Sequence, residues 1–336
     1  MSGTFFSRPA FQTKLGIHRK LAPNAGLHAS PIQLGAGSIG DKWEQFGFGT
    51  MDKEQSFKLL DAYYEAGGNF IDTANAYQDE TSEQFIGEWM EKKGNRDQII
   101  ISSKYTTNYK RGAKDIPQQS QYTGAWNILS RDFEREIIPM AKSFGMALAP
   151  WNVLAGGKIR TDEEEKRRRE TGEKGRTIFG PEWERTETEV AISKALEKVA
   201  AEVGAKTINA VAIAYVLQKT PYVFPIIGGR KVEHLLANLE ALNLKLEKKH
   251  IEYLESIVPF QLGFPYDFFG NGSDYNSLFK TAGYFEKWPV SEAIKPPYVA
   301  EKFADSSENM IQHATLIQHF DEAIQQRKFI FTDLRL

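Results

Sequence analysis

Apolar runs and stretches of helical periodicity alternate along the N-terminal third of the chain. An apolar run at 31–35 leads into a glycine-rich loop at 35–40, and apolar side chains at helical spacing follow from 57 to 64. Gly67 ends that helix, and a second apolar run occupies 69–72. Strands and helices in such alternation are typical of a parallel sheet or barrel.

The order continues with another helix and another strand. Thr81 begins a capping-box pattern, which predicts a helix that ends at Gly94. A β-rich run at 98–104 follows and ends in a lysine. The next segment, 105–124, is polar and has no period of either kind, so the alternation is interrupted there.

Beyond this segment the alternation resumes. Ser130 is expected to cap a helix whose apolar face includes Met140, and an apolar run at 146–151 predicts the next strand. A further helix is predicted over 192–203 and a last strand over 222–227, after which a glycine pair opens another helix.

Composition and charge narrow the possible functions. The chain has 336 residues, a net charge of -2 and no cysteine, so disulfides, thiolate metal sites and cysteine nucleophiles are excluded. The balanced charge predicts neither a nucleic-acid partner nor a membrane partner. The mixed charge run at 162–176 is interpreted as a solvated loop or exposed helix. No apolar leader follows the N-terminus, so a cytoplasmic location is the expectation.

Three polar residues are expected where a parallel barrel places its active site, at the carboxyl ends of strands. Asp72 ends one strand, Tyr77 lies in the loop that follows, and Lys104 ends the next strand. Each has a structural interpretation: a turn residue, a half-buried aromatic and a strand-end cation. Together they suit carbonyl reduction, with the tyrosine as proton donor, the lysine lowering its pKa and the aspartate holding the lysine.

Two further clusters are candidates for binding. The glycine pair and cations at 228–231, with His234 and Asn238, open a helix and suit a phosphate group, although a turn with incidental charges explains them equally well. Trp151 and the basic, glycine-bearing loop at 152–160 follow another strand. Trp151 is a stacking platform for a flat ring or an ordinary packing residue.

These residues lie in motifs that resemble those of the aldo-keto reductase family. The resemblance covers about 15–297 with one gap. Within the family, the motifs more narrowly resemble those of the fungal aryl-alcohol dehydrogenases and norsolorinic acid reductases. The matching motifs, in order, are GAGSIG at 35–40, NFIDTANAY at 69–77, ISSK at 101–104, APW at 149–151 and IIGGRKVEH at 226–234.

The resemblance implies a (β/α)8 barrel that uses NADP(H), with Tyr77 as proton donor and Asp72 and Lys104 as its partners. It also implies that Trp151 stacks on the nicotinamide. The implied cofactor-binding residues, besides Asp72 and Trp151, are Asn152, Val153, Leu154, Ala155, Gly156, Gly157, Lys158 and Arg160 over the pyrophosphate, and Gly229, Arg230, Lys231, His234 and Asn238 at the adenosine 2′-phosphate.

The chain departs from the family pattern in its middle. Judged against the family, the fourth and fifth strands and most of the sixth are missing, with a junction near Gly124 and Ala125. The histidine that assists the tyrosine in the family falls in this gap. The predicted organisation is therefore an incomplete barrel over 1–297, interrupted around 105–125, and an atypical tail over 298–336.

The resemblance implies a reductase of aromatic aldehydes or ketones, or an aryl-alcohol dehydrogenase, in fungal secondary metabolism such as a mycotoxin polyketide pathway. Its small partner is an aromatic carbonyl or alcohol, and Trp43, Phe46 and Phe48 are candidates for the pocket wall. The alternative is a pseudoenzyme or cofactor-binding subunit of the same family. The missing histidine favours that alternative, and the intact trio favours the enzyme. The oligomeric state is left open.

Overall fold

The computed structural model describes residues 13–23, 25–44, 51–104, 124–173, 182–264, 266–269, 280–281, 283–284, 286 and 291–297. By their internal contacts, residues 1–296 form one compact unit and residues 297–336 a second. The tail predicted at 298–336 and the segment 105–123 lie outside the described residues, as do Phe46 and Phe48.

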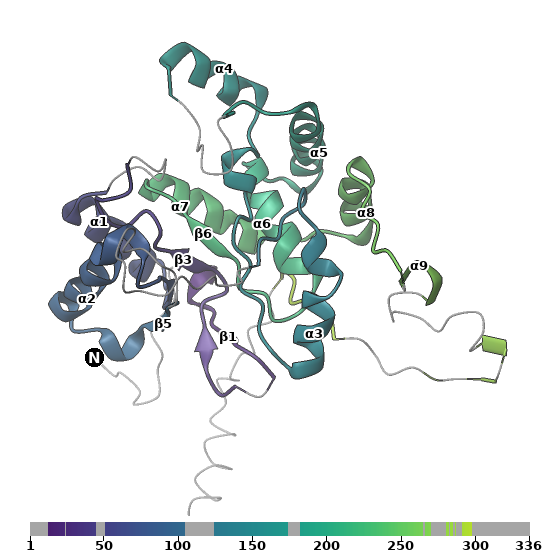
Figure 1. Ribbon diagram of the computed structural model, residues 1–336, viewed down its shortest axis with the longest axis horizontal. Helices are drawn as coiled ribbons and strands as arrows, with labels where there is room; N and C mark the ends of the chain where they lie inside the picture. The colour runs from purple at the N-terminus through teal and green to yellow at the C-terminus, as the bar shows by residue number, and fades with distance from the viewer. Residues whose placement is uncertain are drawn as a thin grey trace, which may run out of the picture. The chain divides into compact units, whose positions relative to one another are not determined.

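From β3 to β5 strands alternate with helices, whereas in the described residues four α-helices, α3 to α6, follow one another before β6, as Figure 1 shows. The strands are β1 (Arg19–Lys20), β2 (His28–Ala29), β3 (Gln33–Gly35), β4 (Phe70–Asp72), β5 (Ile100–Ser102) and β6 (Ile226–Gly228). The α-helices are α1 (Lys53–Glu65), α2 (Thr81–Lys93), α3 (Ile137–Phe144), α4 (Asp162–Thr171), α5 (Glu187–Val203), α6 (Ile208–Lys219), α7 (Val232–Asn238), α8 (Lys248–Ile257) and α9 (Tyr266–Phe269).

A parallel sheet forms the centre of this unit. Its four strands lie in the order β5-β4-β3-β6, so strands far apart in the sequence are neighbours. Two further segments extend the sheet beyond β6: the chain at Leu148 forms a parallel bridge with Val223, and Trp151 forms one with Ala125. The predicted parallel α/β architecture is therefore confirmed, although the runs at 125 and 146–151 pair through isolated bridges and not as full strands.

The outer strand β5 is less buried than the inner strands β3 and β4. The residues of β3 and β4 are all buried, whereas all three residues of β5 are only half-buried. Both edges of a strand are covered only when another strand pairs with it on each side. Within the described residues, β5 has a partner strand on one side only.

Helix α1 shows how the sequence fixes the sheet. Asp52 caps the helix by accepting a hydrogen bond from the Gln55 amide, and Leu59, Leu60 and Tyr63 form its buried face. The Tyr63 hydroxyl lies 2.8 Å from the Ile32 carbonyl oxygen and 2.7 Å from that of Phe70. It therefore ties the helix to the chain entering β3 and to β4.

Some predicted helix starts are wrong. Glu80, not a capping-box threonine, precedes α2, and the Thr81 hydroxyl instead donates to the Gln78 carbonyl oxygen. Ser130 caps no helix, because α3 begins only at Ile137. Met140 lies on the exposed side of α3, opposite the expectation, because the two-turn helix buries Ile138 and Ala141.

Helix α6 was not predicted because its residues are apolar on every side. Ten of its residues are buried, so no polar face marks its period along the sequence. No single helix in the described ranges is long and apolar enough to cross a membrane. Helices α5 and α6 would pass that test together by length and composition only, and they meet at an angle of 86°.

We expect Tyr63→Phe to lower the free energy of unfolding by about 2 kcal/mol, because it leaves buried backbone groups without their partner. The neighbouring Tyr64→Phe is the matched control: its hydroxyl contacts only the exposed Gln98 side chain. That change should cost less than about 0.5 kcal/mol. Urea denaturation of both variants measures the difference, and equal losses would contradict the assigned role of the Tyr63 hydroxyl.

Candidate active site

Parallel pairing of β4 with β5 brings the predicted catalytic residues to one edge of the sheet. Asp72 is the last residue of β4 and lies opposite Ser102 in β5. The ladder continues beyond the strands, since the Thr73 amide donates to the Ser102 carbonyl oxygen at 2.8 Å and the Asn75 amide to that of Lys104 at 3.1 Å. The main chain therefore fixes the spacing between the two strand ends before any side chain contributes.

The three side chains meet as expected. The Lys104 ammonium donates to both carboxylate oxygens of Asp72, at 2.7 and 2.6 Å, and to the Thr73 carbonyl oxygen at 2.8 Å. The same nitrogen lies 3.3 Å from the Tyr77 hydroxyl oxygen. Lys104 thus bridges Asp72 and Tyr77, which is the geometry that the sequence predicted for an acid, its partner and an orienting carboxylate.

The electrostatics differ from the expectation for Tyr77. Burial raises the pKa of the phenol, the charge of Asp72 raises it further, and the opposing effect of Lys104 is too small to reverse them. Burial also raises the pKa of Asp72 against the attraction of Lys104. The prediction that Lys104 would bring the Tyr77 pKa below its ordinary value is therefore wrong for the net shift, although the contribution of Lys104 has the predicted sign.

An unusual turn follows Tyr77. Gln78, Asp79 and Glu80 have φ angles of 53°, 51° and 80°, a left-handed conformation that side-chain-bearing residues rarely adopt. Each such residue costs on the order of 1–3 kcal/mol unless its surroundings hold it in place. The Trp43 indole packs edge-on against Tyr77 beside this turn, with ring centroids 6.0 Å apart.

Sequence reasoning missed this turn. Glycine is the usual residue for a left-handed turn, and none occurs at 78–80. No pattern in the sequence therefore marks Gln78 as buried or as important to the site.

The loop after Trp151 is compact and irregular. Asn152 and Ala155 have φ angles of 58° and 49°, and Gly156 and Gly157 are also left-handed. Val153 is buried, and the Asn152 carbonyl oxygen accepts a hydrogen bond from Asn127 at 2.9 Å. Trp151 and Leu154 are half-buried, so the loop packs against the unit and presents only part of its surface.

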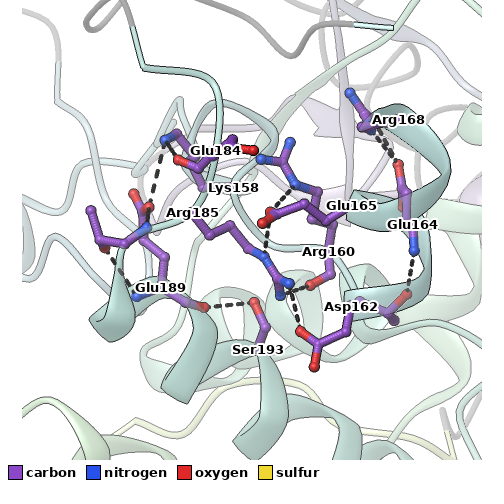
Figure 2. Close-up of polar contacts among 12 residues, drawn as sticks. Lys158, Arg160, Asp162, Glu164, Glu165, Arg168, Glu184, Arg185, Glu189 and Ser193 are labelled. Atoms are coloured by element: carbon purple, nitrogen blue, oxygen red, sulfur yellow. Dashed lines mark hydrogen bonds and ion pairs between the residues drawn. The ribbon is translucent and has the colours of Figure 1, made fainter. Parts of the chain in front are cut away.

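The cations of this loop are occupied by carboxylates, as Figure 2 shows. Arg160 is almost fully buried and donates to the Glu165 carboxylate at 3.0 Å, and Arg185 donates to the same carboxylate at 2.7 Å. Lys158 lies 3.6 Å from the Glu189 carboxylate. These pairs join the loop to α4 and to the start of α5. The charge run predicted as a loop or exposed helix therefore contains the helix α4, which ion pairs hold at its N-terminal end.

Lys158 and Arg160, two of the predicted cofactor contacts of this loop, both lie beside carboxylates. Arg160 shares the Glu165 carboxylate with Arg185, and Lys158 lies near the Glu189 carboxylate. The expectation that both side chains hold a pyrophosphate stays a prediction.

The second predicted cluster lies at the end of β6 and the start of α7. Arg230, Lys231 and His234 are exposed, Gly229 is half-buried and Asn238 is buried. Within the described ranges, neither Arg230 nor Lys231 forms an ion pair. A hydrogen bond from Arg167 lowers the pKa of Glu173, just past α4, and the charge of Lys231 adds a smaller effect in the same direction. The exposed cations are thus positioned to meet an anion, whereas Asn238 is not on the same exposed surface.

The described residues contain no group of histidine and carboxylate side chains that could hold a metal ion. The candidate site among these residues is therefore a Lys, Asp and Tyr group joined at the strand ends of a parallel α/β sheet. The family model described as "Aldo/keto reductase family" matches residues 31–123 and 113–259. The chain belongs to the aldo/keto reductase family.

Similar proteins narrow the group within that family. A protein named aryl-alcohol dehydrogenase (NADP+) from Phanerodontia chrysosporium is 50% identical over 376 residues, with 86% of this chain and 98% of the relative covered. A putative aryl-alcohol dehydrogenase of Saccharomyces cerevisiae is 41% identical, with 81% and 94% covered. Norsolorinic acid reductase B of Dothistroma septosporum is 36% identical, with 75% and 84% covered.

The first of these alignments is longer than the chain itself. It spans 376 positions, and the chain has 336 residues, so at least 40 positions of that relative face a gap in this chain. The two family-model matches meet at 113–123, just before the junction at Gly124 that the sequence predicts.

Proposed function

We propose that this protein is an NADP(H)-dependent reductase of aromatic aldehydes or ketones, or an aryl-alcohol dehydrogenase in the reverse direction. The observation that carries the proposal is the contact of Lys104 with both Asp72 and Tyr77 at one strand edge. The names of the relatives support the substrate class and the cofactor. Roles in fungal secondary metabolism and in the cytoplasm stay predictions.

The chemistry follows from the protonation states at the site. NADPH supplies the hydride for reduction of a carbonyl, and the developing alkoxide then needs a proton. Tyr77 keeps its proton because its pKa is raised, and its hydroxyl donates that proton as the alkoxide forms. Lys104 stabilises the resulting phenolate, 3.3 Å away, and Asp72 keeps the ammonium aimed at it.

The residues present fit part of the cofactor. Arg230 and Lys231 are exposed and adjacent at the end of a parallel strand, which suits the 2′-phosphate of NADPH. Asp72 is paired with Lys104, so any contact of Asp72 with the cofactor ribose would involve that cation as well. The glycine-bearing loop offers backbone amides and the cations Lys158 and Arg160 as candidate contacts of a pyrophosphate.

A second candidate function is a cofactor-binding protein with little turnover. The gap in the alignment and the half-buried edge of β5 support a barrel that lacks its fourth and fifth strands and most of its sixth. An open barrel leaves strand edges unpaired and omits the histidine that polarises the carbonyl in the family. We therefore propose that the chain as written turns over slowly.

Tyr77→Phe tests the reductase. The proton donor is removed while the ring remains, so we expect kcat for an aromatic aldehyde with NADPH to fall by about 10²- to 10⁴-fold. In the parent chain the rate should stay level through neutral pH, because a donor with a raised pKa remains protonated there, and should decline only in alkaline solution. Tyr64→Phe is the control, and an unchanged kcat in Tyr77→Phe would contradict the assignment.

Replacing Arg230 and Lys231 by Ala tests the cofactor. Two charge-assisted contacts to the 2′-phosphate are lost, so the Kd for NADPH should rise by about 10- to 100-fold while that for NADH stays unchanged. Lys248 and Lys249, adjacent exposed cations at the start of α8, give the matched double-Ala control. Equal affinity of the parent chain for both cofactors, measured by fluorescence titration, would count against the phosphate site.

A paired assay tests the incomplete barrel. One protein is the chain as written, and the other has a family-like middle segment inserted at Gly124. We expect the restored protein to reduce an aromatic aldehyde at least about 100-fold faster, since it regains the assisting histidine. Comparable turnover, together with a cooperative thermal transition of the chain as written, would show that the missing-strand interpretation is wrong.

A further inference from the structure

Two loops at the strand edge are joined by one buried amide. The Gln78 side chain has no exposed surface. Its Oε1 accepts hydrogen bonds from the Lys42 amide at 2.9 Å and the Trp43 amide at 2.8 Å, and its Nε2 donates to the Gly37 carbonyl oxygen at 2.8 Å. A single side chain therefore fixes the backbone of the loop after β3 at three points.

The next residue fixes the Trp43 ring. The indole Nε1 donates to the Asp79 carboxylate at 2.9 Å, and the ring meets Tyr77 at an interplanar angle of 73°. Consecutive residues of the left-handed turn thus hold both the backbone and the indole of Trp43. The turn begins directly after the proposed proton donor, so the position of Trp43 is set relative to the Tyr77 phenol.

The two loops approach each other closely at Gly40 and Gln78. Gly40 has a φ of 126°, and a Cβ atom built there would lie 2.4 Å from the Gln78 Cβ. A glycine at 78 would remove the backbone strain of that position but would also remove all three hydrogen bonds. The chain instead keeps a strained glutamine whose side chain makes its three hydrogen bonds to the neighbouring loop, which points to a positioning role.

We propose that Gln78 is a positioning residue for carbonyl binding: it holds Trp43 beside Tyr77 as an aromatic wall for flat substrates. The inference rests on the proposed reductase function. A carbonyl oxygen that contacts the Tyr77 hydroxyl brings an attached ring near the indole, and a fixed indole binds that ring at lower entropic cost than a mobile one. The described hydrogen bonds of Lys104 go to Asp72, Thr73 and Tyr77 and not to Gln78, so the contact of the lysine with the proton donor does not depend on Gln78.

The kinetic test compares Gln78→Ala with Gln98→Ala, which removes an exposed amide that accepts from Tyr64. In Gln78→Ala we expect KM for an aromatic aldehyde to rise about tenfold, the factor equivalent to about 1.4 kcal/mol, while kcat changes less than about twofold. KM for a small aliphatic aldehyde and Kd for NADPH should not change. Adding Gln78→Ala to Trp43→Ala should have no further effect, because both act through one ring.

A conservative variant separates positioning from folding. Gln78→Glu keeps an oxygen for the Lys42 and Trp43 amides but loses the donor to Gly37, so it should restore part of the aromatic KM. Thermal unfolding of each variant reports on the fold. Equal rises of KM for aromatic and aliphatic aldehydes, or additive effects with Trp43→Ala, would overturn the proposal.

A spectroscopic readout tests the positioning without turnover. The chain has six tryptophans, so 5-fluorotryptophan labelling gives separate 19F resonances, and Trp43→Phe assigns one of them. Gln78→Ala should shift and broaden that resonance, whereas Gln98→Ala should not. An unchanged resonance would overturn the proposal even if the enzyme is active. No reduction of any aldehyde by the parent chain would count against the proposed function, and the 19F result would then decide the positioning of Trp43 by itself.

Discussion

The buried carboxylate of Asp72 is the constraint on which the site depends. Its side chain is almost fully buried at the end of β4, and an unpaired charge there would be strongly destabilising. Lys104 offsets part of that cost through two hydrogen bonds, and it reaches Asp72 because β5 pairs in parallel register with β4. The requirement to pair this charge therefore links the register of the sheet to the position of the one cation that meets Tyr77.

The same burial determines how Tyr77 behaves. Desolvation favours the neutral phenol, and so does the negative charge of Asp72, whereas Lys104 favours the phenolate. A phenol held neutral in the resting site but 3.3 Å from an ammonium is a suitable proton donor, since the cation stabilises the anion only as it forms. In the proposed reductase the lysine thus acts on the product of proton transfer more than on the resting pKa.

The sequence predicted the parts of the site that follow from periodicity. Asp72 and Lys104 end apolar runs, and the carboxyl ends of parallel strands share an edge, so their meeting was predictable. The state of Arg160 was not, because its partner Arg185 and their shared Glu165 come from segments whose folding back depends on tertiary contacts. The buried Gln78 was also unpredictable, because its left-handed backbone is held by the loop at 37–43 and not by local preference.

The location of the trio also explains how a site can persist in an incomplete barrel. Asp72 and Tyr77 belong to β4 and its following loop, which have sheet neighbours on both sides. Lys104 follows β5, the outermost strand on its side among the described residues, and its ammonium points back to β4 through Asp72 and Thr73. In the proposed open barrel the missing strands begin beyond β5, so their loss removes the assisting histidine without removing any contact of Lys104. Under that proposal, affinity for the cofactor and an intact proton donor are compatible with slow turnover, because binding and proton transfer would use the described strands whereas polarisation of the carbonyl would use a missing one.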